Sequence, residues 1–159
     1  MGDKMKFFLA NFEEIIASIF ISITTILVVV NIIMRYGLNS GIVWSEEVAT
    51  GCFVWSVFIG AVGVFKHRGH VGVDIVVNLL PELPKRIVST AMDMVLFALN
   101  SYMAYLCVLY IKTSYTKMTP VLGVSSAYIS SSVLIAFIMM AVYSLYFLIQ
   151  DFKGQGGKR

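Results

Sequence analysis

The sequence is poor in charge. Only 13% of its 159 residues are Asp, Glu, Lys or Arg, whereas 58% are hydrophobic. Soluble domains carry about 25% charged residues, so the composition excludes an ordinary soluble protein. The length leaves no room for a separate soluble catalytic domain. The two cysteines, Cys52 and Cys107, both lie in apolar segments, where a thiol behaves as a small apolar group, and we expect no disulfide.

Several patterns of chemistry are also missing. No cysteine pair lies near an expected membrane surface, and no histidine pair lies at mid-span to hold haem. The sequence contains no phosphate loop, serine triad or zinc-protease helix. His67 and His70 are three residues apart without further ligands, which is a weak zinc pattern. We therefore expect no enzyme, no metal site, no cofactor and no nucleic-acid partner.

Four long uncharged stretches dominate the chain: 15–34, 48–65, 94–111 and 118–150. Each is near the roughly 20 apolar residues that a helix needs to cross a bilayer core. Spanning segments must pair their backbone groups within the protein, so these segments should be helices. We predict a single all-α integral membrane domain over 1–159, with spans at about 13–35, 45–66, 86–111 and 127–150. The Gly-rich tail 153–159 should be flexible.

A shorter helix is predicted between the second and third spans. Asp74, Asn78 and Glu82 recur every four residues, and apolar residues occupy the other positions. This is a helical period with one polar face. We expect a short amphipathic helix over about 74–82, lying flat at the membrane surface and ending near Pro81 and Pro84.

The distribution of basic residues predicts the orientation. Nine of the twelve Lys and Arg residues lie in the amino terminus, the middle loop and the carboxyl tail. Arg35, Lys112 and Lys117 lie on the opposite side. Because basic residues favour the cytoplasmic side, both termini and the middle loop should be cytoplasmic. The hairpin loops near 36–44 and 112–127 should face outward.

Asp93 is the one acid placed well inside a predicted span, and it shares a helix face with Asn100, Ser89 and Arg86. Intramembrane acids face protein or water. Asp93 either binds a proton or a cation, or it pairs with a basic residue such as Arg86, Lys66 or Arg68, or with a partner subunit. The basic neighbours at the same depth favour the structural role.

Charged residues also mark the ends of the first two spans. Glu46 and Glu47 follow Trp44 at the start of the second span, and Arg35 leaves the first span at the same level. We predict a contact between Arg35 and one of these glutamates, with the other available to a partner. Glu13 and Glu14 begin the first span near Lys4 and Lys6, and we interpret them as markers of its inner end.

Small residues recur along one face of the second span, at steps of three and four: Ala49, Cys52, Ser56, Gly60 and Gly63. Such spacing favours close packing of membrane helices. The helix that packs there could belong to this chain or to another subunit.

Three motifs carry a resemblance to a known family. They are Trp44-Ser45-Glu46-Glu47, followed by Phe53-Val54-Trp55 and Gly60-Ala61; then Arg68-Gly69-His70-Val71-Gly72-Val73-Asp74; and Thr119-Pro120-Val121-Leu122-Gly123-Val124 with Tyr128. In these motifs and in its four-span pattern, the chain resembles the small membrane subunit of tripartite ATP-independent periplasmic (TRAP) transporters. It departs from that pattern at Ser125 and at Ser130-Ser131-Ser132, where relatives often carry proline.

The resemblance implies a division of labour. A periplasmic binding protein would capture an organic acid, such as sialic acid or a dicarboxylate, and a large multi-span subunit would transport it with sodium. The small subunit would brace the large one and help to dock the binding protein, in the bacterial inner membrane. It implies partner contacts for Arg35, Trp44, Glu46 and Glu47, and a structural turn for Arg68, His70 and Asp74, with no catalytic residue.

Two other classes stay open. The first is a stand-alone small transporter that works as a proton- or sodium-coupled dimer, for which Asp93 is the only candidate site. The second is a membrane-bound electron-transfer or thiol enzyme, which would depend on its cysteines or on a bound chromophore.

Overall fold

The computed structural model describes residues 11–67 and 82–152. They form four helices: α2 (Phe12–Gly37), α3 (Val43–Lys66), α5 (Glu82–Ser114) and α6 (Ala127–Phe152). All four are long and apolar enough to cross a membrane. The prediction of an all-α protein with four spans is confirmed. The predicted amphipathic helix near 74–82 falls almost entirely outside the described residues, as do the tail 153–159, Lys4, Lys6, Arg68, His70 and Asp74.

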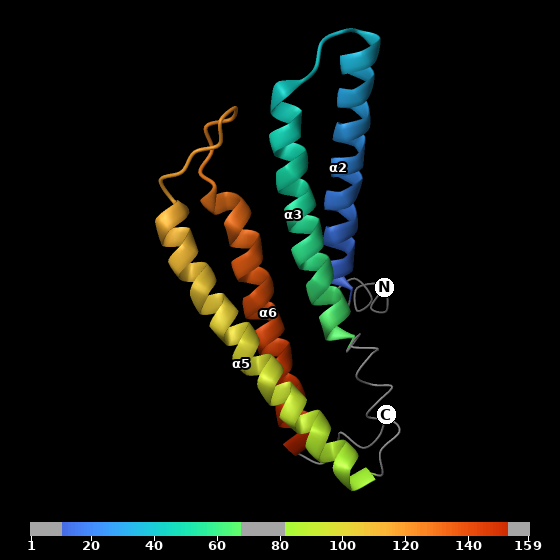
Figure 1. The fold of residues 1–159 in the computed structure, drawn as a ribbon. Helices are drawn as coiled ribbons and strands as arrows, with labels where there is room; N and C mark the ends of the chain where they lie inside the picture. The colour runs from blue at the N-terminus through green and yellow to red at the C-terminus, as the bar shows by residue number, and fades with distance from the viewer. Residues whose placement is uncertain (1–10, 68–81, 153–159) are drawn as a thin grey trace, which may run out of the picture.

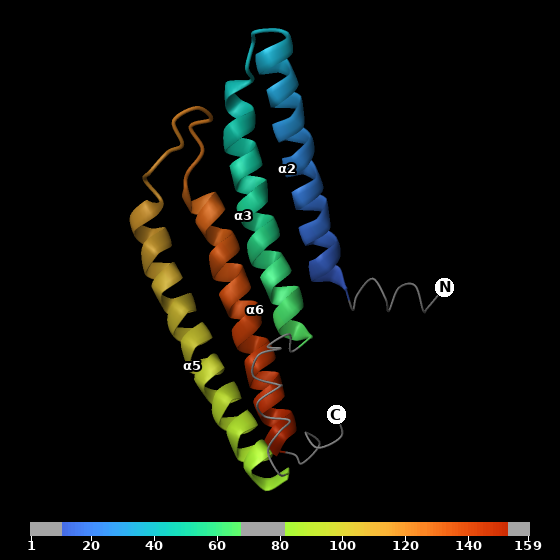
Figure 2. The ribbon, with the colours of Figure 1, turned by 45° about the vertical axis from the view of Figure 1, so that its right-hand side comes forward.

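The four helices lie in a row, in the spatial order α2, α3, α6, α5 (Figures 1 and 2). Each hairpin packs internally, α2 against α3 and α5 against α6, and the hairpins meet where α3 packs against α6. The central helices α3 and α6 therefore bury a much larger share of their membrane-spanning residues than the outer helices do. One broad side of both α2 and α5 is left for lipid or for another protein.

The small-residue face of α3 packs against α2 of the same chain. Ser56 donates a hydrogen bond to the Ala17 carbonyl at 3.0 Å. A Cβ placed on Gly60 would lie 3.6 Å from the Cβ of Ala17, and one on Gly63 would lie 3.1 Å from the Cγ of Glu14. These short approaches need small side chains, because helices in lipid associate by close packing and interhelical hydrogen bonds.

Aromatic rings and small buried residues join the two hairpins. The ring of Trp55 on α3 lies between Phe20 of α2 and Tyr128 of α6, with centroid distances of 5.9 and 5.8 Å. Offset pairs at these distances are favourable. Farther along, Phe58 of α3 contacts Phe137 of α6 at 6.5 Å. The side chains of α6 that are almost fully buried are small: Ser132, Ala136 and Ser144.

Helix α5 begins at Glu82, four residues before the predicted start of the third span. Pro84 therefore lies in its first turn. A proline is tolerated there because the first four N–H groups of a helix have no partner within the helix.

We predict that the close packing of α2 against α3 depends on the absence of a side chain at Gly60. Gly60→Ala adds only an ordinary van der Waals contact to Ala17 and removes the backbone freedom of a glycine inside a helix, so it should stabilise the protein by up to about 1 kcal/mol. Gly60→Leu should destabilise the protein by about 1–3 kcal/mol, because the larger side chain forces the helices apart. Thermal unfolding in detergent measures both variants. Equal stability of the two variants would contradict the close contact.

Candidate functional site

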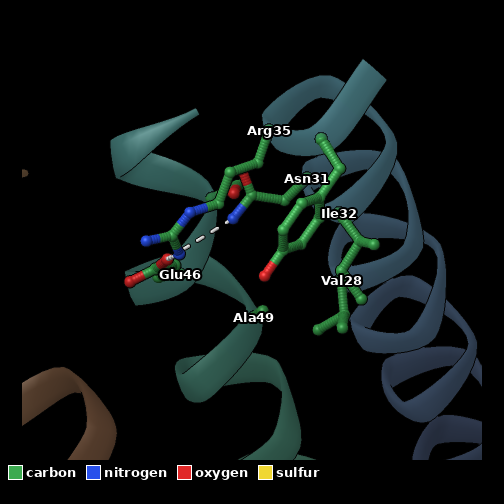
Figure 3. Close-up of a pocket in the computed structure, with 8 residues that line it drawn as sticks. Val28, Asn31, Ile32, Arg35, Glu46 and Ala49 are labelled. Atoms are coloured by element: carbon green, nitrogen blue, oxygen red, sulfur yellow. Dashed lines mark hydrogen bonds and ion pairs between the residues drawn. The ribbon is translucent and has the colours of Figure 1, made fainter. Parts of the chain in front are cut away.

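The predicted contact between Arg35 and one of the two glutamates is present at the tip of the first hairpin, and the glutamate is Glu46. An Nη1 of Arg35 lies 3.9 Å from Oε1 of Glu46, and each side chain is 66% exposed. Asn31 supports the same glutamate through a hydrogen bond of 3.5 Å from its amide nitrogen. Figure 3 shows Asn31 and Arg35 reaching from α2 toward Glu46 on α3. Exposed ion pairs contribute little stability. Because both side chains are exposed, both charges are accessible to a partner.

The hairpin backbone is fixed by Asn31 rather than by its charges. The side-chain oxygen of Asn31 accepts a hydrogen bond of 2.8 Å from the backbone N–H of Ile42, just before α3. Asn39 adopts a left-handed conformation with φ of 53° in the same turn, which asparagine tolerates better than most residues. Two adjoining cavities of about 240 and 400 Å³ open beside this turn, and both are lined by Asn31, Arg35 and Glu46.

Glu47 joins the first hairpin to the second. Its two carboxylate oxygens accept hydrogen bonds from the backbone N–H groups of Val121 and Leu122, at 2.8 and 2.9 Å. Hydrogen bonds to an ionised group are stronger than neutral ones. The start of α3 is thereby attached to the loop between α5 and α6. We expected the glutamate that does not pair with Arg35 to be available to a partner, but in the structure it bonds within the chain. The sequence pattern gave no sign of this contact, because the bonded residues are more than 70 positions apart.

The loop that Glu47 binds has a defined shape. Met118 and Ser125 form an antiparallel bridge, and the N–H of Thr119 donates to the carbonyl of Val124 at 2.8 Å. Gly123 closes the turn with φ of 64°, a conformation that side chains rarely adopt. Met118, Val121, Leu122 and Val124 of this loop are exposed.

A second polar cluster lies at the opposite end of α3. Glu13 of α2, which is only 5% exposed, accepts hydrogen bonds from Lys66 of α3 at 2.9 Å and from the hydroxyl of Tyr143 of α6. Beside it, Nε2 of His67 lies 2.8 Å from Oε1 of Glu14. We interpreted these glutamates as markers of the inner end of α2, and that interpretation missed the contact of three helices.

Pairing residue positions across the antiparallel hairpin predicted a contact of Arg35 with a glutamate, and the same procedure could have found the Glu13–Lys66 pair. The first two helices run antiparallel about a turn near residue 40, which places residue 13 opposite residue 66, just as it places residue 35 opposite residue 46. Tyr143 had no such signal, because nothing in the sequence predicts the register of α6 against α2.

The remaining predicted residues lie in two places. Asp93 and Asn100 are buried on the side of α5 that packs against α6, and Asn100 donates to the carbonyl of Leu96 at 2.8 Å. Trp44 is half exposed in the first turn of α3. Cys52 and Cys107 carry free thiols. In the part of the chain that the structure describes, no three His, Cys, Asp or Glu residues are grouped to hold a metal.

The four apolar helices and the polar contacts at their ends define a multi-pass membrane protein. A family model described as tripartite ATP-independent periplasmic transporters, DctQ component, matches residues 24–154. The chain belongs to this family, whose members are transporter permeases of the inner membrane and work with a large permease subunit.

Three relatives illustrate the similarity. A protein of Haemophilus influenzae that is named as a TRAP transporter small permease is 29% identical over 99% of this chain and all of its own length. The C4-dicarboxylate TRAP transporter small permease protein DctQ of Vibrio cholerae is 36% identical over 46% of this chain and 32% of its own. The sialic acid TRAP transporter permease protein SiaT of Haemophilus influenzae is 30% identical over 58% of this chain and 15% of its own.

We predict that the Glu47 contact orders the 117–126 loop. In Glu47→Gln an NH2 group, which donates hydrogen bonds, replaces one of the two acceptor oxygens. The N–H of Val121 or Leu122 therefore loses its acceptor. Hydrogen exchange at these two amides should become several-fold faster. The matched control is Glu46→Gln, which removes an exposed charge and should leave the loop amides unchanged. Unchanged exchange in Glu47→Gln would show that the loop holds its shape without the carboxylate.

We also predict that Glu13 is essential for the packing of α2, α3 and α6. Glu13→Gln should destabilise the protein by about 1–3 kcal/mol, because it breaks a buried pair and leaves Lys66 or Tyr143 without its acceptor. Glu14→Gln, whose contact to His67 is exposed, should cost less than about 1 kcal/mol. Thermal unfolding compares the two variants, and equal effects would refute the distinction.

Proposed function

We propose that this chain braces a large multi-span transport subunit and helps to dock a periplasmic binding protein. The observation that carries the proposal is the use of polar side chains at the helix ends. Arg35, Glu47 and Glu13 contact other parts of the same chain, and the four described helices run without a break. Transporters usually form substrate sites from broken helices at mid-membrane. Unbroken helices in a row suit a scaffold instead.

The relatives support the large partner. The region similar to this chain makes up only 15% of the permease protein SiaT. In that protein, a segment like this one is covalently part of a much larger permease. We infer that the present chain stands beside a subunit of comparable size.

The orientation follows from charge. Lys66 lies at the end of the row that also holds the Glu13 cluster, and Arg35, Lys112 and Lys117 lie near the other end. Nine of the twelve basic residues come, in the sequence, before α2, between the last residue of α3 and the first turns of α5, or after α6. We therefore infer that the Lys66 end faces the cytoplasm and that the hairpin tips face outward.

The outward end has the properties of a docking surface. Tyr36, Leu38, Val43 and Trp44 are large and exposed around the first hairpin, beside the accessible charges of Arg35 and Glu46. Aromatic residues and arginine are frequent anchors at protein interfaces, and rim charges steer association. These residues are the proposed contacts with the binding protein or with the outer surface of the large subunit.

The transported substrate is an organic acid in this proposal, and a sodium gradient drives its uptake. One relative is named for C4-dicarboxylates and another for sialic acid. The present chain contributes no substrate contact in this arrangement, so the other subunits determine which acid is carried. Its other partner is the lipid around the outer helices.

Co-expression with the large subunit and the binding protein tests this function. The chain should co-purify with the large subunit, and sodium-driven uptake in liposomes should require all three proteins. Asp93→Asn should weaken assembly but leave the sodium dependence of the remaining uptake unchanged. Solute uptake by the chain alone, or a normally assembled Asp93→Asn complex that no longer depends on sodium, would favour the stand-alone transporter instead.

A further inference from the structure

We propose that the outward face of α5 is the surface on which a helix of the large transport subunit packs. This face, called the α5 outer face below, consists of Ala91, Ala98, Tyr102, Tyr105 and Lys112. The proposal rests on the proposed function, because that function supplies the partner.

The five residues share one side of the helix. They follow one another at steps of seven, four, three and seven residues, which superpose on a period of 3.6. All five are exposed, with Tyr102 and Tyr105 at 59% and 60%. Asp93 and Asn100 lie on the other side, against α6. The described helices therefore leave the α5 outer face uncovered.

Tyr102 and Tyr105 lie deep in the membrane. The membrane-spanning part of α5, Val88–Ser114, has 27 residues and is about 40 Å long at 1.5 Å per residue. Both tyrosines lie within about 6 Å of its midpoint, whereas the hydrocarbon core extends about 15 Å to each side of the midplane. Side chains on a helix lean toward its amino terminus. The hydroxyl of Tyr105 thus leans toward the midplane and away from the nearer surface.

These two hydroxyls differ from the exposed hydroxyls of α2. Ser18, Ser22 and Thr25 each donate to the carbonyl four residues earlier, at 2.7, 2.7 and 2.8 Å. Hydroxyls bonded in this way are compatible with lipid. A tyrosine hydroxyl is too far from its own backbone to do the same, and neither Tyr102 nor Tyr105 has a hydrogen-bond partner among the described residues. Lipid tails supply no acceptor, whereas a neighbouring helix does.

The charge on this face selects the kind of partner. Lys112 is exposed at the outer end, seven residues beyond Tyr105. A complementary helix offers a hydrogen-bond acceptor near its middle and a carboxylate about 10 Å farther out. A second copy of this chain fits poorly. Two copies that met through their α5 outer faces in the same orientation would bring two Lys112 ammonium groups together, and this face carries no carboxylate to pair with either. Ala91 and Ala98 allow a partner helix to approach closely.

The first experiment removes only the two hydroxyls. Tyr102→Phe/Tyr105→Phe should leave the thermal unfolding of the small subunit alone unchanged. In the co-expressed complex, it should raise several-fold the fraction of small subunit that dissociates from the large subunit in mild detergent. Tyr110→Phe is the matched control, because Tyr110 is equally exposed on α5 but lies near its outer end, and it should change neither measurement.

The second experiment identifies the neighbour. A photo-reactive phenylalanine derivative at position 102 should cross-link to the large subunit, and one at position 29 on the outer side of α2 should not. Cross-links from position 102 only to lipid or to a second copy, in preparations where the wild-type chain retains the large subunit, would overturn the α5 outer face and leave the proposed function intact. A wild-type chain that never retains the large subunit would overturn the proposed function itself.

Discussion

Two carboxylates on opposite ends of the helix row connect the hairpins, and the arrangement of the chain depends on them. Glu13 bonds to α3 and α6 at one end, and Glu47 bonds the start of α3 to the α5–α6 loop at the other. Between these ends, the main contact of the hairpins among the described residues is that of α3 with α6, which includes Trp55 and Phe58. Because lipid tails are as apolar as the helix surfaces, burial alone does not hold membrane helices together. Ionic and hydrogen-bonded contacts at the ends therefore matter more here than they would in a water-soluble bundle.

The row leaves two broad outer faces, and they differ in chemistry. The outer side of α2 carries hydroxyls that are already bonded to its own backbone, at Ser18, Ser22 and Thr25. The outer side of α5 carries tyrosine hydroxyls for which the described chain supplies no acceptor. The α2 side therefore suits lipid, whereas the α5 side suits protein. For the scaffold role that we propose, such an asymmetry directs attachment to one side, since two equivalent faces would permit attachment in either direction.

The sequence predicted the parts of this structure that depend on local pattern. Apolar length predicted the four helices, and spacing along an antiparallel hairpin predicted a contact of Arg35 with Glu46 or Glu47. Spacing also gave the small face of α3, although not the helix that covers it. The same hairpin spacing contained the Glu13–Lys66 pair, which we missed by relating Glu13 to the nearer lysines. The contacts of Glu47 and Tyr143 could not be predicted, because they depend on how one hairpin lies against the other, and no periodic pattern records that register.

The two ends of the row are held with unequal strength. At the Lys66 end, a nearly buried carboxylate bonds to side chains on two other helices, in surroundings where each bond is weakly screened. At the other end, the Arg35–Glu46 pair is exposed and 3.9 Å apart, and Glu47 holds a loop rather than a helix. The polar contacts of the hairpins are therefore most deeply buried at the Lys66 end. Small displacements of the hairpin tips should cost less, which suits the docking of a binding protein that we propose for this end.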